Sequence, residues 1–327
     1  MLRLGKNIKI ILFNIIIIII LLILSESIVR FFNLSQMQGY KAEIFRDKIN
    51  RLKPNSEGVV GGIKFFVDKN GLRVPEINYK YKTTNKILFI GDSVTFGVGV
   101  AEEESFVGIF RKNLHTSEVY NLSLFGYQIE DYKVQLNELK KFYPIRKIIY
   151  FLTLNDVYDH DNVRTVNFIE NKYQDGWKKI LNLNFLRNIN IYLRERSYLF
   201  TYLKGVAIDP QASWFANVLN YYKENDLQNL NSFFTKFSNF AFNNKIEAYL
   251  FIVPYEFQTR KCDFNSLFPQ NKIKELTKEV KINIYDLTSD FCDYSNPKRL
   301  FLKYDPMHLS KEGHKFVYNL TNPIINY

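Results

Sequence analysis

The segment KILFIGDSVTFGVGV, residues 86–100, decides how the rest of the chain is interpreted. Its first part, KILFI, is a short apolar run, which is typical of a strand buried on both faces. The run ends at Gly91-Asp92-Ser93, where a small residue, an acid and a hydroxyl follow the apolar side chains. Taken alone, a serine in this place is most often a helix N-cap. It can also be a reactive group presented at the edge of a sheet, where ligands bind in open parallel sheets.

Four more apolar runs predict strands, and the stretches between them carry apolar residues at helical spacing. Unbroken apolar strands separated by amphipathic helices indicate a parallel sheet covered on both faces. The predicted fold class is therefore α/β, with three layers in the order α/β/α. The further strands are expected at 118–124, 147–154, 248–254 and 282–287, and the helices at 102–114, 128–142 and 311–321.

The chain divides into an anchor, a tether and one large domain. We expect residues 1–27 to hold a cytoplasmic tip and a membrane anchor, 28–57 to form a tether, and 58–327 to form the domain. Within the domain, residues 58–74 predict two short strands around Asp68-Lys69-Asn70-Gly71, because Asn-Gly favours a tight hairpin turn. Residues 157–245 interrupt the strand–helix rhythm and predict a helical insertion, either a cap over the site or plain packing helices.

Composition limits the functions that the domain can have. The 327 residues include 44 Lys and Arg against 33 Asp and Glu, a net charge of +11, spread along the chain without a cluster. No nucleic-acid-binding motif appears, so nucleic acid is not an expected partner. Two cysteines and four scattered histidines lack zinc-site spacing, and Gly97-x-Gly99 lacks the third glycine of a dinucleotide loop. The sequence predicts neither a metal nor another cofactor.

Residues 8–24, IKIILFNIIIIIILLIL, predict a single membrane-spanning helix. Seventeen helical residues span about 25 Å, close to the roughly 30 Å of a bilayer core. Arg3, Lys6 and Lys9 on the leading side favour a cytoplasmic N-terminus and a domain outside the cytoplasm, periplasmic or at the cell surface. The alternative is a cleaved signal peptide with its cleavage site at Ser25-Glu26-Ser27, although the apolar run is longer than usual for one. Both alternatives export the domain.

Polar residues follow four segments of the predicted α/β domain. They stand in the blocks GDSVTFGVGV (91–100), NLSLFG (121–126), LNDVYD (154–159) and DPMHLSKEGH (305–314). In order and spacing these blocks resemble those of the SGNH/GDSL hydrolase superfamily, and VDKNGLRV (67–74) is similar to the lead-in of its membrane-attached bacterial members. The resemblance covers about residues 58–325 and implies a flavodoxin-like parallel sheet. One departure is Thr153, at a place where the family often has glycine.

The resemblance also implies a role for each block. It implies Ser93 as the nucleophile, His308 as the base and Asp305 as the acid that orients the imidazole, an arrangement that ester cleavage requires. It implies three oxyanion donors: the backbone N–H groups of Ser93 and Gly126 and the side-chain amide of Asn155. Asp92 is expected to brace the loop as a hydrogen-bond acceptor. The serine does not stand in Gly-x-Ser-x-Gly, so an α/β-hydrolase nucleophile elbow is not supported.

Each of these residues also has a purely structural interpretation. Asn155-Asp156 could be a turn, Asp305-Pro306 could be turn chemistry with a solvated His308, and His314 is expected to face solvent or to pack. All of these structural interpretations would have to hold at once, at four segments in the family's order, so the sequence favours a functional site. Cys262 and Cys292 could form a disulfide in an exported domain or remain two buried thiols.

The function expected from the resemblance is an extracytoplasmic serine esterase that removes acyl groups from an envelope carbohydrate or lipid through an acyl-serine intermediate. Its expected partners are the acylated substrate, the membrane through the N-terminal helix, and the envelope polysaccharide machinery. Two alternatives remain. An O-acyltransferase would use the same residues to pass the acyl group to a sugar hydroxyl, and a catalytically silent envelope-assembly protein would use none of them.

Overall fold

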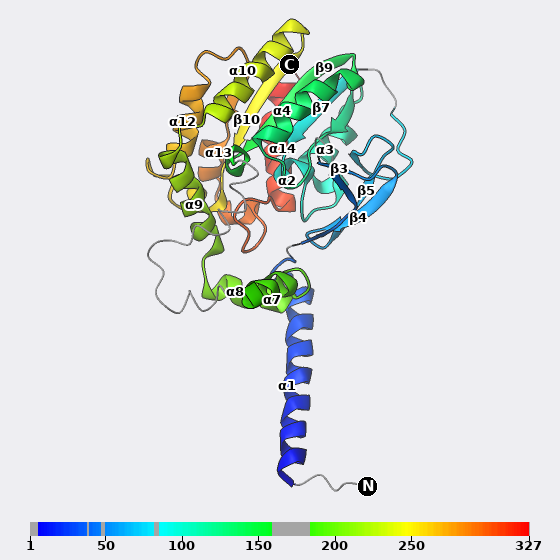
Figure 1. Cartoon of the computed structure of the whole chain (residues 1–327), viewed down its shortest axis with the longest axis vertical. Helices are drawn as coiled ribbons and strands as arrows, with labels where there is room; N and C mark the ends of the chain where they lie inside the picture. The colour runs from blue at the N-terminus through cyan, green and yellow to red at the C-terminus, as the bar shows by residue number, and fades with distance from the viewer. Residues whose placement is uncertain (1–5, 38, 47–49, 82–84, 159–183, 327) are drawn as a thin grey trace.

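A computed structural model describes residues 6–37, 39–46, 50–81, 85–158 and 184–326. Figure 1 shows a layered domain that stands at one end of a single long helix, α1 (Lys6–Phe31). Within α1, Ile8–Phe31 is long and apolar enough to cross a membrane, with a mean hydropathy of 3.0. The most apolar part of α1 is not buried by any described part of the domain.

The centre of the domain is a five-stranded parallel sheet, as the apolar runs predict. Its order β11-β10-β9-β7-β8 becomes 5-4-3-1-2 when the strands are numbered along the chain, which is the flavodoxin-like arrangement. The predicted strands differ from the observed ones by no more than three residues at either end. The strands are β7 (Lys86–Gly91), β8 (Glu118–Asn121), β9 (Ile145–Thr153), β10 (Glu247–Val253) and β11 (Asn283–Asp286).

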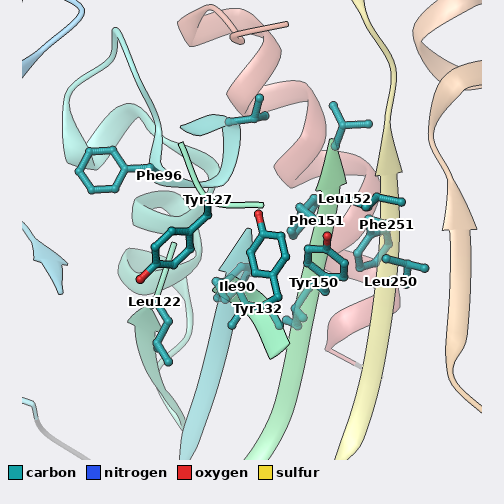
Figure 2. Close-up of a cluster of buried hydrophobic side chains, with 14 of the residues drawn as sticks. Ile90, Phe96, Leu122, Tyr127, Tyr132, Tyr150, Phe151, Leu152, Leu250 and Phe251 are labelled. Atoms are coloured by element: carbon teal, nitrogen blue, oxygen red, sulfur yellow. The ribbon is translucent and has the colours of Figure 1, made fainter. Parts of the chain in front are cut away.

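Aromatic side chains show that helices cover both faces of the sheet. Tyr150 and Phe151 are neighbours on β9 and point to opposite faces, because side chains alternate along a strand. Tyr150 packs against Tyr132 of α4 (Ile129–Glu138), at 5.0 Å between ring centroids, whereas Phe151 packs against Phe106 of α3 (Phe106–Asn113) at 4.4 Å. Figure 2 shows this cluster, with Tyr132 and Tyr150 side by side. The predicted three-layer arrangement is therefore confirmed.

Further helices connect these layers and close the C-terminal part of the domain. They include α14, which packs against α3 on the Phe151 face of the sheet. The remaining helices outside the 157–245 region are α2 (Ser93–Phe96), η1 (Glu102–Glu104), η2 (Leu139–Phe142), η3 (Leu154–Val157), α11 (Glu256–Lys261), α12 (Phe268–Leu276), α13 (Thr288–Cys292), η4 (Pro297–Leu300) and α14 (Lys311–Ile325).

A second, antiparallel sheet precedes β7. Its last two strands pair around residues 68–72, so the predicted hairpin is confirmed, and Asp68 Oδ1 accepts from the N–H groups of Asn70 and Leu72. The sheet also contains a turn at Gly61-Gly62 that was not predicted. Its order is β1-β4-β5-β6, with β1 (Tyr40–Lys41), β4 (Ser56–Val60), β5 (Ile63–Val67) and β6 (Arg73–Val74).

The segment 28–57 is more ordered than the predicted tether. Its first residues continue α1 as far as Phe31, and Val29 is buried. Strand β1 then joins the antiparallel sheet, and a separate hairpin follows, formed by β2 (Ile44–Arg46) and β3 (Asn50–Leu52). The chain therefore docks on the domain within ten residues of leaving α1, which fixes the domain close to the end of that helix.

Part of the predicted insertion belongs to the sheet-covering layer instead. Residues 159–183 of that prediction lie outside the described residues. Helix α10 (Gln228–Asn243) packs against α4, and its Phe233 ring lies 5.4 Å from that of Tyr150, so α10 covers the central sheet. The other described helices of this region are α7 (Asn184–Arg194), α8 (Tyr198–Ala207) and α9 (Pro210–Glu224). Helix α9 packs against α11 and α12, whereas α7 and α8 lie beside the end of α1 that is nearest the domain (Figure 1).

Cys262 and Cys292 are joined by a disulfide, with 6.1 Å between their Cα atoms. The bond connects the end of α11 to the end of α13. Of the two alternatives left open by the sequence, the structure therefore contains the bonded pair.

Candidate active site

Ser93 lies at the carboxyl end of β7, as its place in the sequence predicts. It is the first residue of α2, and the N-cap is Asp92, whose Oδ1 accepts from the N–H of Val94 at 2.9 Å. Gly91 is required by sterics, because a Cβ there would lie 2.1 Å from Thr95 Oγ1 and 2.9 Å from the Phe151 carbonyl oxygen. The strand therefore ends on glycine, acid and serine so that a tight turn can present Ser93 at the edge of the sheet.

Ser93, His308 and Asp305 form a continuous hydrogen-bonded chain. The Nε2 atom of His308 lies 2.8 Å from Ser93 Oγ, and its Nδ1 atom lies 2.8 Å from Asp305 Oδ2. An ionised carboxylate can only accept, so the Nδ1 proton is donated to Asp305 and Nε2 is left as an acceptor for the serine hydroxyl. The arrangement matches the nucleophile, base and orienting acid of a serine hydrolase.

Asp305 and His308 lie on one short loop, and backbone N–H groups of that loop hold the Asp305 side chain in place. Asp305 Oδ1 accepts from the N–H groups of Met307 and His308, at 3.0 and 2.8 Å. On the other side, the N–H of Glu256, the first residue of α11, donates to the Pro306 carbonyl at 2.9 Å and so ties the loop to the helix that follows β10. The orientation of the imidazole is therefore fixed by its own loop and by the start of a neighbouring helix.

The two partners shift each other's pKa in opposite directions. Burial acts to raise the pKa of Asp305, but the His308 charge and the hydrogen bonds from His308 and Met307 outweigh it, and the pKa of Asp305 is lowered. Burial acts to lower the pKa of His308, but the charge of Asp305, its hydrogen bond and the charge of Asp92 outweigh it, and the pKa of His308 is raised. The pair therefore favours an ionised aspartate beside a histidine that accepts protons readily.

Asp92 braces the turn as an acceptor, which confirms its expected role. Besides capping α2, its Oδ1 accepts from Thr153 Oγ1 at 3.0 Å, and its Oδ2 lies 3.3 Å from Ser93 Oγ. Burial raises the pKa of Asp92 against the opposing effect of these hydrogen bonds. Thr153, at the place where the related family often has glycine, thus links the end of β9 to the end of β7.

Asn155 lies on η3, the turn that follows β9, and contacts Asp92, the residue before Ser93. Its Nδ2 donates to Asp92 Oδ2 at 3.4 Å, and its Oδ1 accepts from the Tyr255 hydroxyl at 2.9 Å. Burial raises the pKa of Tyr255 well above its ordinary value, so the hydroxyl stays protonated and donates. The tyrosine therefore fixes the amide with its oxygen toward β10 and its N–H groups toward the Ser93 turn.

Gly126 lies on the wall of the cavity into which Ser93 and His308 open. Its φ of +83° is in the left-handed region that glycine adopts without strain. A Cβ at this position would have no heavy atom within 4 Å, so the residue is set by backbone conformation rather than by crowding. Its backbone is accordingly open to a ligand in the cavity.

The cavity has a volume of about 680 Å³ and is lined mainly by apolar side chains. Its wall is formed by the ends of the central strands, the loop 302–308, the segment that follows α1, part of the antiparallel strands, and helices α7, α8 and α9. The segment after α1 contributes Gln36, Met37 and Tyr40, and α8 contributes Thr201, Lys204 and Gly205. A cavity of this size and lining accommodates an acyl chain or a sugar ring beside the serine.

Two supporting residues were not predicted from the sequence. Tyr255 orients Asn155, and only its place directly after a buried strand could have pointed to it. Arg73 of β6 is buried and donates to the carbonyls of Phe96, Gly97 and Val100, so it holds the loop that follows Ser93. Burial, with repulsion from a neighbouring arginine, lowers the pKa of Arg73 to about 9.

His314 packs in the core, one of the two outcomes expected for it. It is fully buried on α14, and its Nδ1 accepts from the N–H of Phe106 at 3.2 Å. Burial, with repulsion from Arg73 and His308, lowers the pKa of His314 to about 3, so the ring remains neutral. It supports the helix layer and takes no place in the hydrogen-bonded chain at Ser93.

Comparisons with known proteins give structural likenesses only. Neither protein-family models nor curated proteins match the chain. Among solved structures, it is similar to an acetyl xylan esterase (TM-score 0.43, 17% identity, covering 73% of this chain and 99% of that one). It is also similar to a lipase/acylhydrolase from Enterococcus faecalis (TM-score 0.42, 14% identity, covering 74% of this chain and 95% of that one). A member of the lipolytic G-D-S-L family from Veillonella parvula is similar as well (TM-score 0.39, 11% identity, covering 74% of this chain and 98% of that one).

Proposed function

We propose that this chain is a serine esterase that removes acyl groups from an acylated carbohydrate or lipid of the cell envelope. The observation that carries the proposal is the unbroken chain from Ser93 through His308 to Asp305, with 2.8 Å at each step, at the wall of an open cavity. A serine N-cap would need none of these contacts, and the structure gives the N-cap position to Asp92. A catalytically silent protein would have no need of this alignment.

In the proposed reaction, Ser93 Oγ bonds to the ester carbonyl carbon as its proton moves to His308 Nε2. The imidazolium is stabilised by Asp305, and it then gives the proton to the leaving alcohol oxygen as the ester bond breaks. Water attacks the resulting acyl-serine, losing a proton to His308, and the acid leaves as Ser93 recovers its hydrogen. The raised pKa of His308 suits both directions of proton transfer near neutral pH.

The negative charge that forms on the carbonyl oxygen needs donors that are already in place. Ser93 N–H, Gly126 N–H and Asn155 Nδ2 are the proposed donors. The support for Asn155 is its fixed amide orientation, since Tyr255 holds the oxygen away from Ser93. The support for Gly126 is its exposed backbone on the wall that it shares with Ser93 and His308.

We further propose that α1 anchors the chain in a membrane with its N-terminus in the cytoplasm and the Ser93 domain outside. The apolar helix and the basic residues before it support this orientation. Protease added to intact spheroplasts should digest the domain while a cytoplasmic marker survives. Protection of the domain would place it in the cytoplasm and remove an envelope substrate from the proposal.

The enzymatic part is tested with the full-length protein in detergent. We expect hydrolysis of p-nitrophenyl acetate and of O-acetylated oligosaccharide, and no hydrolysis by Ser93→Ala prepared in parallel. A parallel reaction should contain an unacetylated glycan, because acyl transfer to sugar rather than water would identify an acyltransferase that uses the same residues. Equal rates for the wild type and Ser93→Ala on every ester would contradict the proposal.

A further inference from the structure

Helices α7 and α8 leave large apolar side chains uncovered. On α8, Leu203 and Val206 are 55% and 63% exposed, and they lie on one face with Leu199 at helical spacing. On α7, Ile191 and Tyr192 are also exposed. A helix beside a water-soluble domain normally buries such a stripe. No described part of the chain covers this one.

The position of α8 indicates what that covering is. Glu26 of α1 accepts from Ser197 Oγ and from the N–H groups of Tyr198 and Leu199, at 2.9, 3.0 and 2.9 Å. Glu26 stands two residues after the apolar run 8–24. The N-terminus of α8 is therefore tied to α1 at the depth where a membrane-spanning helix would leave the hydrocarbon core.

Side chains at the same level are of the kinds that gather at membrane surfaces. Phe31 is 80% exposed at the end of α1. The Arg30 guanidinium lies 4.8 Å from the centre of the Tyr198 ring, and that of Arg196 lies 4.1 Å from the centre of the Tyr192 ring. Aromatic rings and cationic side chains are favoured where headgroups meet the apolar core, and the cations favour an anionic surface.

We propose that α7 and α8 lie in the interface of the bilayer that α1 crosses, and that the Ser93 cavity receives an acyl group carried by a membrane lipid. The second half rests on the proposed esterase function. The cavity lies on the α8 side of the domain, since Thr201, Lys204 and Gly205 form part of its wall, and Figure 1 shows α8 beside the end of α1 that is nearest the domain.

Close packing fixes α8 against the loop that carries the acid and the histidine. A Cβ at Gly205 would lie 2.2 Å from the Tyr304 ring, so the two segments are in direct contact. The Tyr202 and Tyr304 rings also meet edge to face, with centroids 6.0 Å apart. Tyr304 precedes Asp305, and the depth of α8 in the interface would therefore set the distance between the catalytic loop and the lipid.

The first test measures how deeply α8 lies in the bilayer. The full chain is reconstituted into vesicles of phosphatidylethanolamine and phosphatidylglycerol. Spin labels are placed at Leu203→Cys and, as the control, at Phe242→Cys. Phe242 is 66% exposed on α10, near the start of β10 and so at the opposite end of the sheet. We expect the label at 203 to be relaxed by oxygen in the lipid and the label at 242 by a water-soluble nickel complex. Equal access of the nickel complex to both would overturn the interface and leave the face for a protein partner.

The second test compares Leu203→Glu with Phe242→Glu on two esters. With p-nitrophenyl acetate in water, both variants should match the wild type. With a long-chain p-nitrophenyl ester dissolved in the vesicles, Leu203→Glu should be slower by about tenfold, a factor that the lost burial of one leucine can supply. An unchanged vesicle rate would overturn lipid delivery. No wild-type hydrolysis of either ester would overturn the esterase function, while the labels would still decide the interface.

Discussion

The edge of the sheet around Ser93 and the helix pair α7–α8 differ in how far their side chains are packed by other parts of the protein. At the edge, two polar side chains are held by other groups of the protein: Asp92 accepts from three neighbouring groups and Asn155 is held from both ends. On the helix pair, apolar side chains such as Leu203 and Val206 are left largely exposed by the described residues. The contrast teaches that the first region was built for fixed geometry, and the second for contact with something apolar beyond the domain.

The largest loss of activity is expected from a substitution at Ser93. Ser93→Ala should lower ester turnover by about 10³–10⁶-fold, because the proposed nucleophile is removed while the alignment of His308 and Asp305 remains. Its circular dichroism and its retention in vesicles should equal those of the wild type. Turnover within a few fold of the wild type would remove Ser93 from the proposed role.

A smaller effect is expected at Asn155. Asn155→Ala should lower turnover by about 10²–10³-fold with little change in KM, as the loss of one oxyanion donor does. Tyr255→Phe keeps the Asn155 amide but removes the hydroxyl that orients it. The turnover of this variant should therefore lie between that of the wild type and that of Asn155→Ala. If Asn155→Ala raised only KM, the residue would bind substrate or support structure instead.

Stability should separate the two regions as well. Arg73→Met leaves the carbonyls of Phe96, Gly97 and Val100 without their donor and should lower the free energy of unfolding by about 2–4 kcal/mol. Leu203→Ser on α8 should change it by less than about 0.5 kcal/mol in detergent, because that side chain is exposed. Thermal unfolding followed by circular dichroism measures both variants. Equal losses would show that α8 is part of the core.

The smallest effect concerns pH. Attack requires neutral His308, whose pKa is raised from the ordinary 6.5 chiefly through Asp305, against the opposing effect of burial. As the pH falls through this raised pKa, the imidazole becomes protonated and kcat/KM should fall. Asp305→Asn removes the negative charge, so the residual activity should keep its acid limb at lower pH than the wild type. An acid limb that does not move would mean that another group titrates.

Much of the site could be predicted because the chemistry is local in the sequence. Apolar runs marked every strand of the central sheet, and Ser93, Asn155, Asp305 and His308 stand close to strand ends or in one short loop. Supporting contacts between distant segments had no such signal. Arg73 reaches a loop more than twenty residues away, and Tyr255 meets Asn155, 100 residues earlier in the chain, beyond the ends of two neighbouring strands; only the folded chain brings them together.

The predicted tether and insertion show the same limit. Residues 28–57 are short and polar enough to be interpreted as a linker. Tyr40 and Lys41 nevertheless pair in β1 with Val60 and Val59 of β4, and that pairing depends on partners 20 and 18 residues ahead. Helix α10 has the amphipathic pattern of any surface helix, and only its contact with Tyr150 assigns it to the sheet layer. Local pattern indicates the element, whereas tertiary contacts decide where it packs.

The central claim, that Ser93 is a nucleophile activated by His308, is tested most directly by covalent trapping. The full-length protein in detergent is treated with a fluorophosphonate, which phosphonylates an activated serine, and the adduct is located by mass spectrometry of peptides. A single adduct should appear on Ser93, be absent in Ser93→Ala and form far more slowly in His308→Ala. An unmodified Ser93, or equal labelling in His308→Ala, would contradict the proposed mechanism.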